Sequence, residues 1–549
     1  MDKNIKFLVL IILDGLGVAP DSESNAITQA KPQFLEHFWK NYPHCYLNAS
    51  GNSVGLPGGV VGNSEVGHMS IGGGKVIYQE IARIDKEIEA KTFLDNKTFK
   101  EACNHIKKNK GKMHIMGLVS DGKVHSSQDH LYACLEICKA ERLPKDKVFL
   151  HIFTDGRDTS PQSAEKYLIE LDKQCKYYGI GTIASIIGRY FSMDRDNRWE
   201  RTKKAYDLIV HGIGVKANNW QEGLKLFYDQ GKTDEFLEPI VIMKKENPLT
   251  NVTPGDSVIF FNYRADRAVQ LSKAFEDEDF EGWKRDKIQN LYFAGFSNYE
   301  KGIPMTRAAE DTAYHGGESQ MVKNLFSEEL QKSDEGFPKN QIFPPEKVDY
   351  SFGKIISDSG IKQLRITESE KFPHVTYFFN CRKKEPFPNE YRIEIPSPRD
   401  VPTYDKKPEM SSFEVTDTLI NSINQNTYKF ILVNYACGDM VPHTGSLEAS
   451  IKAVKTIDQC LGKLINVVLN KKGIAIITAD HGNAEELVNL QTGKIDTEHS
   501  TNPVPFIFIQ KGLKPKELNY GLLADIAPTI LFTLGIPQPD PMTGNNLLE

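Results

Sequence analysis

Three short hydrophobic runs along the chain each end abruptly in a polar cluster. They are FLVLIIL at residues 7–13, FILVNY at 430–435 and GIAIIT at 473–478. Continuous runs of Val, Ile and Leu, without polar alternation, are typical of parallel strands that are buried on both faces. Residues 446–469 instead repeat their apolar positions at helical spacing. The pattern therefore predicts an α/β fold built on a parallel sheet.

An aspartate follows each of these predicted strands: Asp14, Asp439 and Asp480. In open parallel sheets ligands bind beyond the carboxyl ends of the strands. We therefore expect these three carboxylates to face one crevice, although hundreds of residues separate them in the sequence.

The middle of the chain holds a second set of strand-to-loop junctions, and these deliver histidine or arginine. They lie at residues 112–127, 148–160, 183–201 and 257–272. The arrangement predicts a second α/β domain, residues 79–340, inserted into an outer domain made of residues 1–78 and 341–549. Residues 327–351 are polar and proline-rich, which is typical of a surface excursion that ends in a linker.

Composition narrows the class of function. A chain of 549 residues with 40% hydrophobic and 26% charged residues is typical of a globular protein with more than one domain. The net charge of -6, with both signs well mixed, argues against nucleic-acid and membrane partners and favours a small-molecule substrate. Eight cysteines without a CxxC pair, and no run long enough to span a bilayer, predict a cytoplasmic location.

Carboxylates and imidazoles gather around the first set of strand ends. The candidate ligands are Asp14, Asp439, His443, Asp480, His481 and His499. Such mixed donors suit borderline divalent ions such as Mn or Zn. A single Asp-His pair would be an ordinary turn, but this set exceeds what one ion with an open position needs. We therefore predict two metal ions roughly 4 Å apart.

Ser64 lies among glycines in the segment at residues 56–75, which reads as a phosphate loop, a nucleophile or a flexible loop. The phosphate-loop spacing fails because Met69 stands where glycine is required, and Val76 where Ser or Thr is required. A dinucleotide fingerprint fails at Pro20. Divalent cations and a helix N-terminus can activate a serine hydroxyl, so we predict that Ser64 is a nucleophile.

The second set of junctions is rich in arginine, whose planar fork matches carboxylate and phosphate oxygens. The members are His125, Arg157, Asp158, Arg189, Arg195, Arg198, Arg264 and Arg267. Alternating charge in DRDNRWER would also suit a solvated face. Because Arg189 and Arg195 follow a predicted buried strand, they are favoured for binding over Arg198. The set predicts a site for a phosphorylated organic acid.

Many motifs, in order and over nearly the whole chain, resemble those of the cofactor-independent phosphoglycerate mutases of the alkaline phosphatase superfamily. They are LDGLG, GNSEVGH, DGKVHS, DGRDT, GRYFSMDRDNRWER, NYRADR, TESEKFPHVTYFFN, DMVPHTG, TADHGNAE and EHSTNPVPF. The resemblance implies an alkaline-phosphatase-like parallel-sheet domain with an inserted domain that binds the substrate.

The resemblance also assigns roles to residues of this sequence. One Mn ion would be held by Asp439, His443 and His499, and the other by Asp14, Ser64, Asp480 and His481. The phosphoglycerate site would be lined by His125, Arg157, Asp158, Arg189, Arg195, Arg264 and Arg267, with Lys371 contacting the phosphate from the outer domain. Ser64, Asp158 and Lys371 would be catalytic, with Asp158 as general acid and base.

The activity implied is the interconversion of 3-phosphoglycerate and 2-phosphoglycerate, a step of glycolysis and gluconeogenesis, by a monomer. A phosphoserine intermediate would make a bisphosphoglycerate primer unnecessary. The alternatives are a metal-dependent phosphatase or another phosphomutase of the same superfamily, and an inactive metal-binding scaffold.

The chain departs from the family pattern at Pro442, Ser127, Cys381 and Cys437. Pro442 and Cys381 stand where glycine is usual, and Ser127 where histidine is usual. A small buried residue is expected at Cys437 rather than a metal ligand. The isolated histidines His44, His68 and His151 are interpreted as structural.

Overall fold

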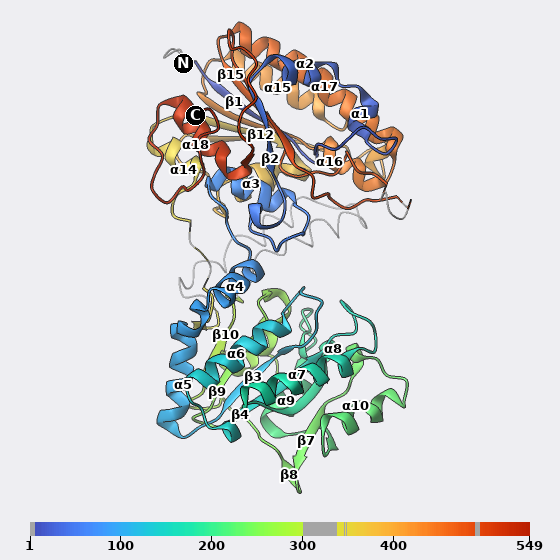
Figure 1. The fold of residues 1–549 in the computed structure, drawn as a ribbon, viewed down its shortest axis with the longest axis vertical. Helices are drawn as coiled ribbons and strands as arrows, with labels where there is room; N and C mark the ends of the chain where they lie inside the picture. Colours follow the sequence, from blue (N-terminus) through green and yellow to red (C-terminus); the bar gives the residue numbers. More distant parts are fainter. Residues whose placement is uncertain (1–5, 300–336, 345, 347, 489–492, 494) are drawn as a thin grey trace. The chain divides into compact units, whose positions relative to one another are not determined.

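A computed structural model of the chain describes residues 6–299, 337–344, 346, 348–488, 493 and 495–549. The chain divides into two compact units: Met1–Ala82 with Lys347–Glu549, and Arg83–Glu346 (Figure 1). In sequence, the second unit interrupts the first. The predicted boundaries at 78/79 and 340/341 differ from these by a few residues. Within the predicted excursion at 327–351, residues 327–336, 345 and 347 lie outside the described residues.

The first unit is built on an eight-stranded sheet. Its order is β13 (Glu390–Ile395), β12 (Gln363–Glu368), β14 (Phe430–Tyr435), β1 (Leu8–Leu13), β15 (Ile474–Thr478), β16 (Val504–Ile509), β2 (His44–Asn48) and β17 (Gly521–Leu522). The strands from β13 to β15 are parallel, whereas β16 runs antiparallel to both of its neighbours. The three hydrophobic runs of the sequence are the adjacent strands β14, β1 and β15, so the predicted parallel sheet is confirmed.

Helices cover both faces of this sheet (Figure 1). On one face α17 (Leu447–Asn470) packs against α1 (Ala26–Ala30), α2 (Gln33–Asn41) and α15 (Ser412–Asn424). On the other, α3 (Ser64–Gly73) packs against α14 (Phe352–Asp358) and α18 (Ile526–Leu534). The side chains of β1, β14 and β15 are all buried, as the continuous apolar runs predict.

The second unit has its own mixed sheet. The order is β11 (Asn340–Gln341), β10 (Tyr292–Gly295), β9 (Ser257–Phe260), β3 (Met113–Leu118), β4 (Val148–Thr154), β5 (Thr182–Gly188), β7 (Ile240–Lys244) and β6 (Val215–Ala217), with β8 (Asn247–Pro248) beside β7. The strands from β11 to β5 are parallel and β7 is antiparallel to β5. The four strand-to-loop junctions of the sequence belong to the adjacent strands β9, β3, β4 and β5.

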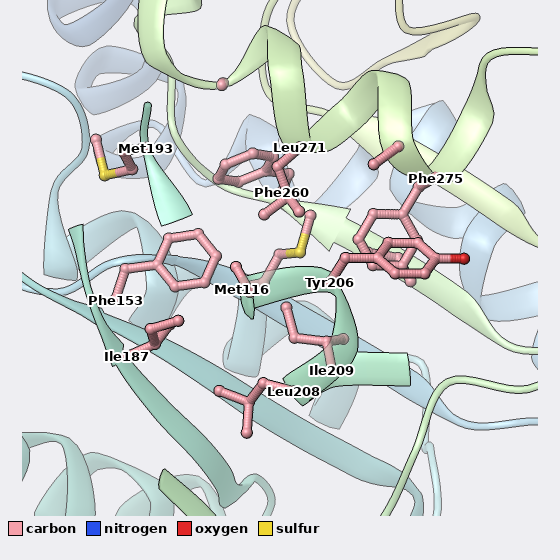
Figure 2. Close-up of a cluster of buried hydrophobic side chains, with 14 of the residues drawn as sticks. Met116, Phe153, Ile187, Met193, Tyr206, Leu208, Ile209, Phe260, Leu271 and Phe275 are labelled. Carbon is pink, nitrogen blue, oxygen red and sulfur yellow. The ribbon is translucent and has the colours of Figure 1, made fainter. Parts of the chain in front are cut away.

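Among the described residues, the α-helices that lie wholly within the second unit are α5 (Lys97–Asn109), α6 (Gln128–Ala140), α7 (Ala164–Tyr178), α8 (Arg189–Ser192), α9 (Trp199–His211), α10 (Trp220–Tyr228) and α11 (Val269–Glu276). Figure 2 shows how α9 and α11 pack on the sheet. Met116, Phe153 and Ile187 from three strands meet Tyr206 and Ile209 of α9 in this hydrophobic cluster. The packing fixes the strands whose following loops carry the arginines.

The helix α4 (Glu80–Glu89) spans the residue at which the two units divide. Among the described residues, the structure holds no helix with the length and apolar character of a membrane span.

Candidate functional site

The three predicted carboxylates lie at one edge of the first unit's sheet. Strand β1 pairs with β14 and β15 in parallel, with Leu13 opposite Tyr435 and Ile12 opposite Thr478. Asp14 and Asp480 therefore leave neighbouring strands at the same level, while Asp439 lies on the short helix α16 (Cys437–Met440) after β14. All three side chains are buried.

Ser64 is the first residue of α3, and its side chain lies among these carboxylates. The side chain of Asn63 caps the helix by accepting a hydrogen bond from the Val66 backbone N–H at 3.1 Å. The Ser64 hydroxyl lies 3.2 Å from Asp14 Oδ1 and 2.9 Å from His481 Nε2. A buried hydroxyl at the positive end of a helix is well placed to interact with an anion.

Lys371 joins the serine to the carboxylates. Its Nζ donates to Ser64 Oγ at 2.7 Å, to Asp14 Oδ1 at 2.8 Å and to Asp439 Oδ2 at 2.6 Å. Burial disfavours the ammonium, but Asp14, Asp439 and Asp480 outweigh that effect and raise the pKa of Lys371. Burial would likewise raise the pKa of Asp14 and Asp439, yet the nearby positive charge holds both below their usual range. The cluster is therefore ionised.

Two histidines present ring nitrogens to Asp439. Nε2 of His443 and Nε2 of His499 lie 3.1 Å apart, and they lie 3.3 and 3.2 Å from Asp439 Oδ1. Nδ1 of each ring bonds a backbone carbonyl at 2.8 Å, Thr497 O for His443 and Gly62 O for His499. This leaves both Nε2 lone pairs facing one carboxylate oxygen, an arrangement that a shared cation stabilises.

A second group of donors surrounds Asp14 and Asp480. Asp480 Oδ2 is buried without a hydrogen-bond donor among the described residues, and a buried, unsatisfied carboxylate oxygen fits a cation. Burial opposes the protonation of His481, but Asp480, Asp14 and Asp439 outweigh it and raise its pKa to about 9. The described residues include two groups whose ligand atoms lie within 4.8 Å of one another: Asp439, His481 and His499, and Asp14, His68 and Asp480.

The structure thus brings together every metal-ligand candidate predicted from the sequence, with Lys371. His481 is grouped with Asp439 and also lies 3.4 Å from Asp14 Oδ1. His68, which the sequence indicated as structural, is part of the cluster: its Nδ1 lies 3.1 Å from Asp480 Oδ2. Asn434 was not singled out in the sequence, yet it donates to Asp14 Oδ2 at 2.6 Å.

In the second unit the predicted arginines gather around His125. Arg189, at the start of α8, donates to Asp155 and Asp158. Arg195 and Arg264 both pair with Asp266, at 3.4 and 3.1 Å, while Arg267 donates to the Met193 carbonyl at 3.1 Å. His125 Nε2 lies 4.0 Å from Asp158 Oδ2, and Nδ1 lies 3.7 Å from Asp266 Oδ1.

The pKa shifts within this cluster show how close together its charged groups lie. Burial and the charges of Arg189, Arg264, Arg267 and Arg195 lower the pKa of His125 to about 2. The pKa of Arg267 is also lowered, by burial and then by neighbouring arginines. Four arginines outnumber the three carboxylates beside them, Asp155, Asp158 and Asp266. The cluster therefore suits an anionic ligand with a neutral imidazole in its midst.

The remaining predicted residues lie farther out. Arg157 pairs with Glu235 at 3.4 Å, and the exposed Arg198 precedes α9. The acidic partners Asp155, Asp266 and Glu235 had not been singled out in the sequence. Acidic partners of arginine carry no sequence signal of their own, because Asp and Glu are common in every loop.

The family departures are accommodated locally. Pro442 begins a 3₁₀ turn, Pro442–Thr444, where its missing N–H costs nothing. The Ser127 hydroxyl caps α6 by accepting from the Asp129 backbone N–H at 3.3 Å. Cys437 is buried and accepts from the Ser412 hydroxyl at 3.2 Å. Cys381 has a φ of 54°, a left-handed conformation that favours glycine.

Comparisons with known proteins agree over the whole chain. A family model described as the N-terminus of BPG-independent PGAM matches residues 84–301. The 2,3-bisphosphoglycerate-independent phosphoglycerate mutase of Clostridium beijerinckii is 42% identical over 543 residues, with 99% of each chain covered. That of Clostridium perfringens is 44% identical over 545 residues, again with 99% of each covered.

Among solved structures, a phosphoglycerate mutase of Leishmania mexicana, crystallised at low cobalt concentration, matches 99% of this chain and 98% of its own. The TM-score is 0.58 at 27% sequence identity. Sequence and fold therefore agree along the full length, and the chain belongs to the 2,3-bisphosphoglycerate-independent phosphoglycerate mutase family.

Proposed function

We propose that this chain interconverts 3-phosphoglycerate and 2-phosphoglycerate through a phosphoserine at Ser64, without a bisphosphoglycerate primer. Full-length relatives bear the name of that activity. The observation that carries the mechanism is the buried Ser64 hydroxyl at the start of α3, 2.7 Å from the Lys371 ammonium.

Ser64 Oγ would attack phosphorus, forming the serine P–O bond while the P–O bond to the glycerate C3 oxygen breaks. Asp14 Oδ1 lies 3.2 Å from the hydroxyl oxygen, within reach of its proton. The Lys371 ammonium would stabilise negative charge on the transferred group. The reverse transfer, to the C2 oxygen, completes the interconversion and returns Ser64 to its starting state.

The donor set fits two divalent ions, and we propose Mn²⁺ for both. Asp439, His443 and His499 would hold one ion, and Asp14, Ser64, Asp480 and His481 the other. Carboxylate with imidazole is the donor chemistry that suits Mn²⁺ and Zn²⁺. When bound, the ions would supply positive charge at the phosphoryl group and favour the ionised serine.

The second unit would hold the glycerate. Arg157, Arg189, Arg195, Arg264 and Arg267 would bind the carboxylate and phosphate oxygens, with His125 among them. Asp158, whose Oδ2 accepts from Arg189, would take the proton from one glycerate hydroxyl and return it to the other. The cytoplasmic location and the monomeric state stay predictions.

Replacing the nucleophile tests the proposal. Ser64→Ala should lower kcat by at least about 10³-fold, because no other step forms the phosphoenzyme. Mass spectrometry of wild type quenched during turnover should find phosphate on Ser64. Ser70 lies on the same helix, and its buried hydroxyl has no hydrogen-bond partner among the described residues. Ser70→Ala should therefore retain activity. Phosphate on another residue, or an active Ser64→Ala variant, would refute the assignment.

A further inference from the structure

His68 is fully buried on α3, one helical turn after Ser64, and all its polar contacts lead to candidate metal ligands. Its Nδ1 lies 2.8 Å from the Ser64 carbonyl oxygen and 3.1 Å from Asp480 Oδ2. Its Nε2 lies 3.2 Å from Asn434 Nδ2. The ring therefore contacts both the helix that carries the serine and the loop that carries Asp480.

The hydrogen-bonding partners assign the proton on this ring. Asn434 Nδ2 donates to Asp14 Oδ2 at 2.6 Å, so the amide nitrogen rather than its oxygen faces the cluster. The same nitrogen donates to His68 Nε2, which therefore accepts. The proton of the ring then lies on Nδ1, which donates to the Ser64 carbonyl and faces Asp480 Oδ2.

From this chain of contacts we infer that His68, with Asn434 behind it, is a positioning residue that holds Asp14, Ser64 and Asp480 in register as one set of ligands. Asn434 orients the Asp14 carboxylate, while the His68 Nδ1–H donates to the Ser64 carbonyl in the first turn of α3 and places its positive end 3.1 Å from Asp480 Oδ2. The inference rests on the proposed two-metal function.

Proteins commonly tune metal sites through side chains that contact the ligands rather than the metal, as His68 and Asn434 do here. Groups that hydrogen-bond the ligands fix their orientation, and removing them costs about 10- to 100-fold in metal affinity or activity. Asp480 Oδ2 accepts no hydrogen bond of good geometry from the described residues, so the Nδ1–H dipole of His68, 3.1 Å away, acts on it electrostatically. Without His68, Ser64 and Asp480 would lose a buried side chain that contacts both of them.

Two amide substitutions test whether His68 acts through its Nδ1–H donor or through the volume of its ring. An asparagine at position 68 places its amide nitrogen close to where Nδ1 stands, whereas a glutamine places its amide nearer to Nε2. We expect His68→Asn to bind Mn²⁺ within about tenfold of wild type. His68→Gln and His68→Leu should bind the Asp14 and Asp480 ion at least about tenfold more weakly.

Mn²⁺ binding to the metal-free protein, followed by calorimetry without substrate, is the primary measurement. Steady-state kinetics at saturating Mn²⁺ is the second, and there kcat should fall in His68→Gln while the KM for 3-phosphoglycerate stays near the wild-type value. Ser70→Ala, a buried change on the same helix, should match wild type in both. If His68→Leu does not fold, the comparison of the two amide variants decides.

Equal Mn²⁺ affinity in His68→Asn and His68→Gln would overturn the inference, as would wild-type affinity in His68→Leu. If wild type binds Mn²⁺ and forms 2-phosphoglycerate while the variants behave alike, the positioning role alone fails. If wild type binds no Mn²⁺, the two-metal proposal fails and the positioning role fails with it.

Discussion

The histidines of this chain have different roles, and the role of each depends on its burial and on the residues that it contacts. Burial and the arginines around His125 lower its pKa and keep the ring neutral, so it can face an anion without adding charge. His114 and His151 lie in the second unit's core, where Asp256, His114, His151 and Ser185 form a hydrogen-bonded row across β3, β4 and β5. The interpretation of His151 as structural agrees with this buried row.

The buried pair gives a pH dependence of stability. Burial lowers the pKa of both His114 and His151 below the ordinary value of 6.5. Below about pH 6.5 these two rings therefore bind more protons in the unfolded chain than in the folded one. The stability that the neutral rings contribute to the fold is fully present above that pH and is lost as the pH falls. We expect the free energy of unfolding to decrease by up to about 1.4 kcal/mol per pH unit for each ring.

Urea unfolding at pH 7.5, 6.0 and 5.0 measures this slope. His151→Gln removes one titrating ring and should flatten the decrease relative to wild type. His37→Gln changes an exposed histidine and should leave the slope unchanged. A His151→Gln variant with the wild-type pH dependence would show that the row does not titrate on unfolding.

At the scale of elements, α3 owes its position to glycines that bring its backbone against neighbouring chain. A Cβ on Gly67 would lie 2.5 Å from the Asp480 carbonyl oxygen, and one on Gly72 only 1.9 Å from the Phe379 carbonyl oxygen. These contacts explain why a helix that carries a buried serine is rich in a poor helix former. Close packing of backbone on backbone sets the distance from Ser64 to Asp480.

The first of these contacts yields a counter-intuitive prediction. Alanine is favoured over glycine in a helix interior by about 1 kcal/mol, yet Gly67→Ala should destabilise the protein by about 1–3 kcal/mol through overpacking. It should also lower kcat, because α3 and Asp480 must separate. Thermal unfolding and steady-state turnover measure both effects.

Gly73→Ala is the matched control on the same helix. Its Cβ would meet Ile77 Cδ1 at 2.9 Å and Cys381 Sγ at 3.4 Å, both at the ends of side chains that can shift. Stability and turnover should therefore stay close to wild type. If Gly67→Ala proves as stable and active as Gly73→Ala, the close approach of α3 to Asp480 does not constrain the site.

The sequence predicted those elements best whose burial leaves a simple pattern. β1, β14 and β15 are continuous apolar runs because both their faces are covered. His68 was interpreted as structural although it stands four residues after Ser64, a spacing that places both on one helix face. Asn434 could not be predicted, because an asparagine inside an apolar strand does not indicate which carboxylate it will meet.

On the scale of the whole molecule, the chain combines two α/β units with different chemistry after their strands. The first unit gathers carboxylates, imidazoles, a serine and a lysine, and the second gathers arginines around a neutral histidine. If the first transfers phosphate and the second retains glycerate, then weakening the second should change the fate of the phosphoserine rather than prevent its formation.

Arg264→Ala and Arg157→Ala test this division of labour. Glycerate held less firmly presents its hydroxyl less often to the phosphoserine, so water competes for the phosphoryl group. We expect the formation of 2-phosphoglycerate to fall at least about 100-fold, while the fraction of turnovers that release inorganic phosphate rises. Both products are followed in one reaction. Arg142→Ala, an exposed arginine that precedes β4, should partition like wild type. A wild-type enzyme that mainly releases phosphate would identify a phosphatase, and unchanged partitioning and rate in both variants would remove the arginines from the glycerate site.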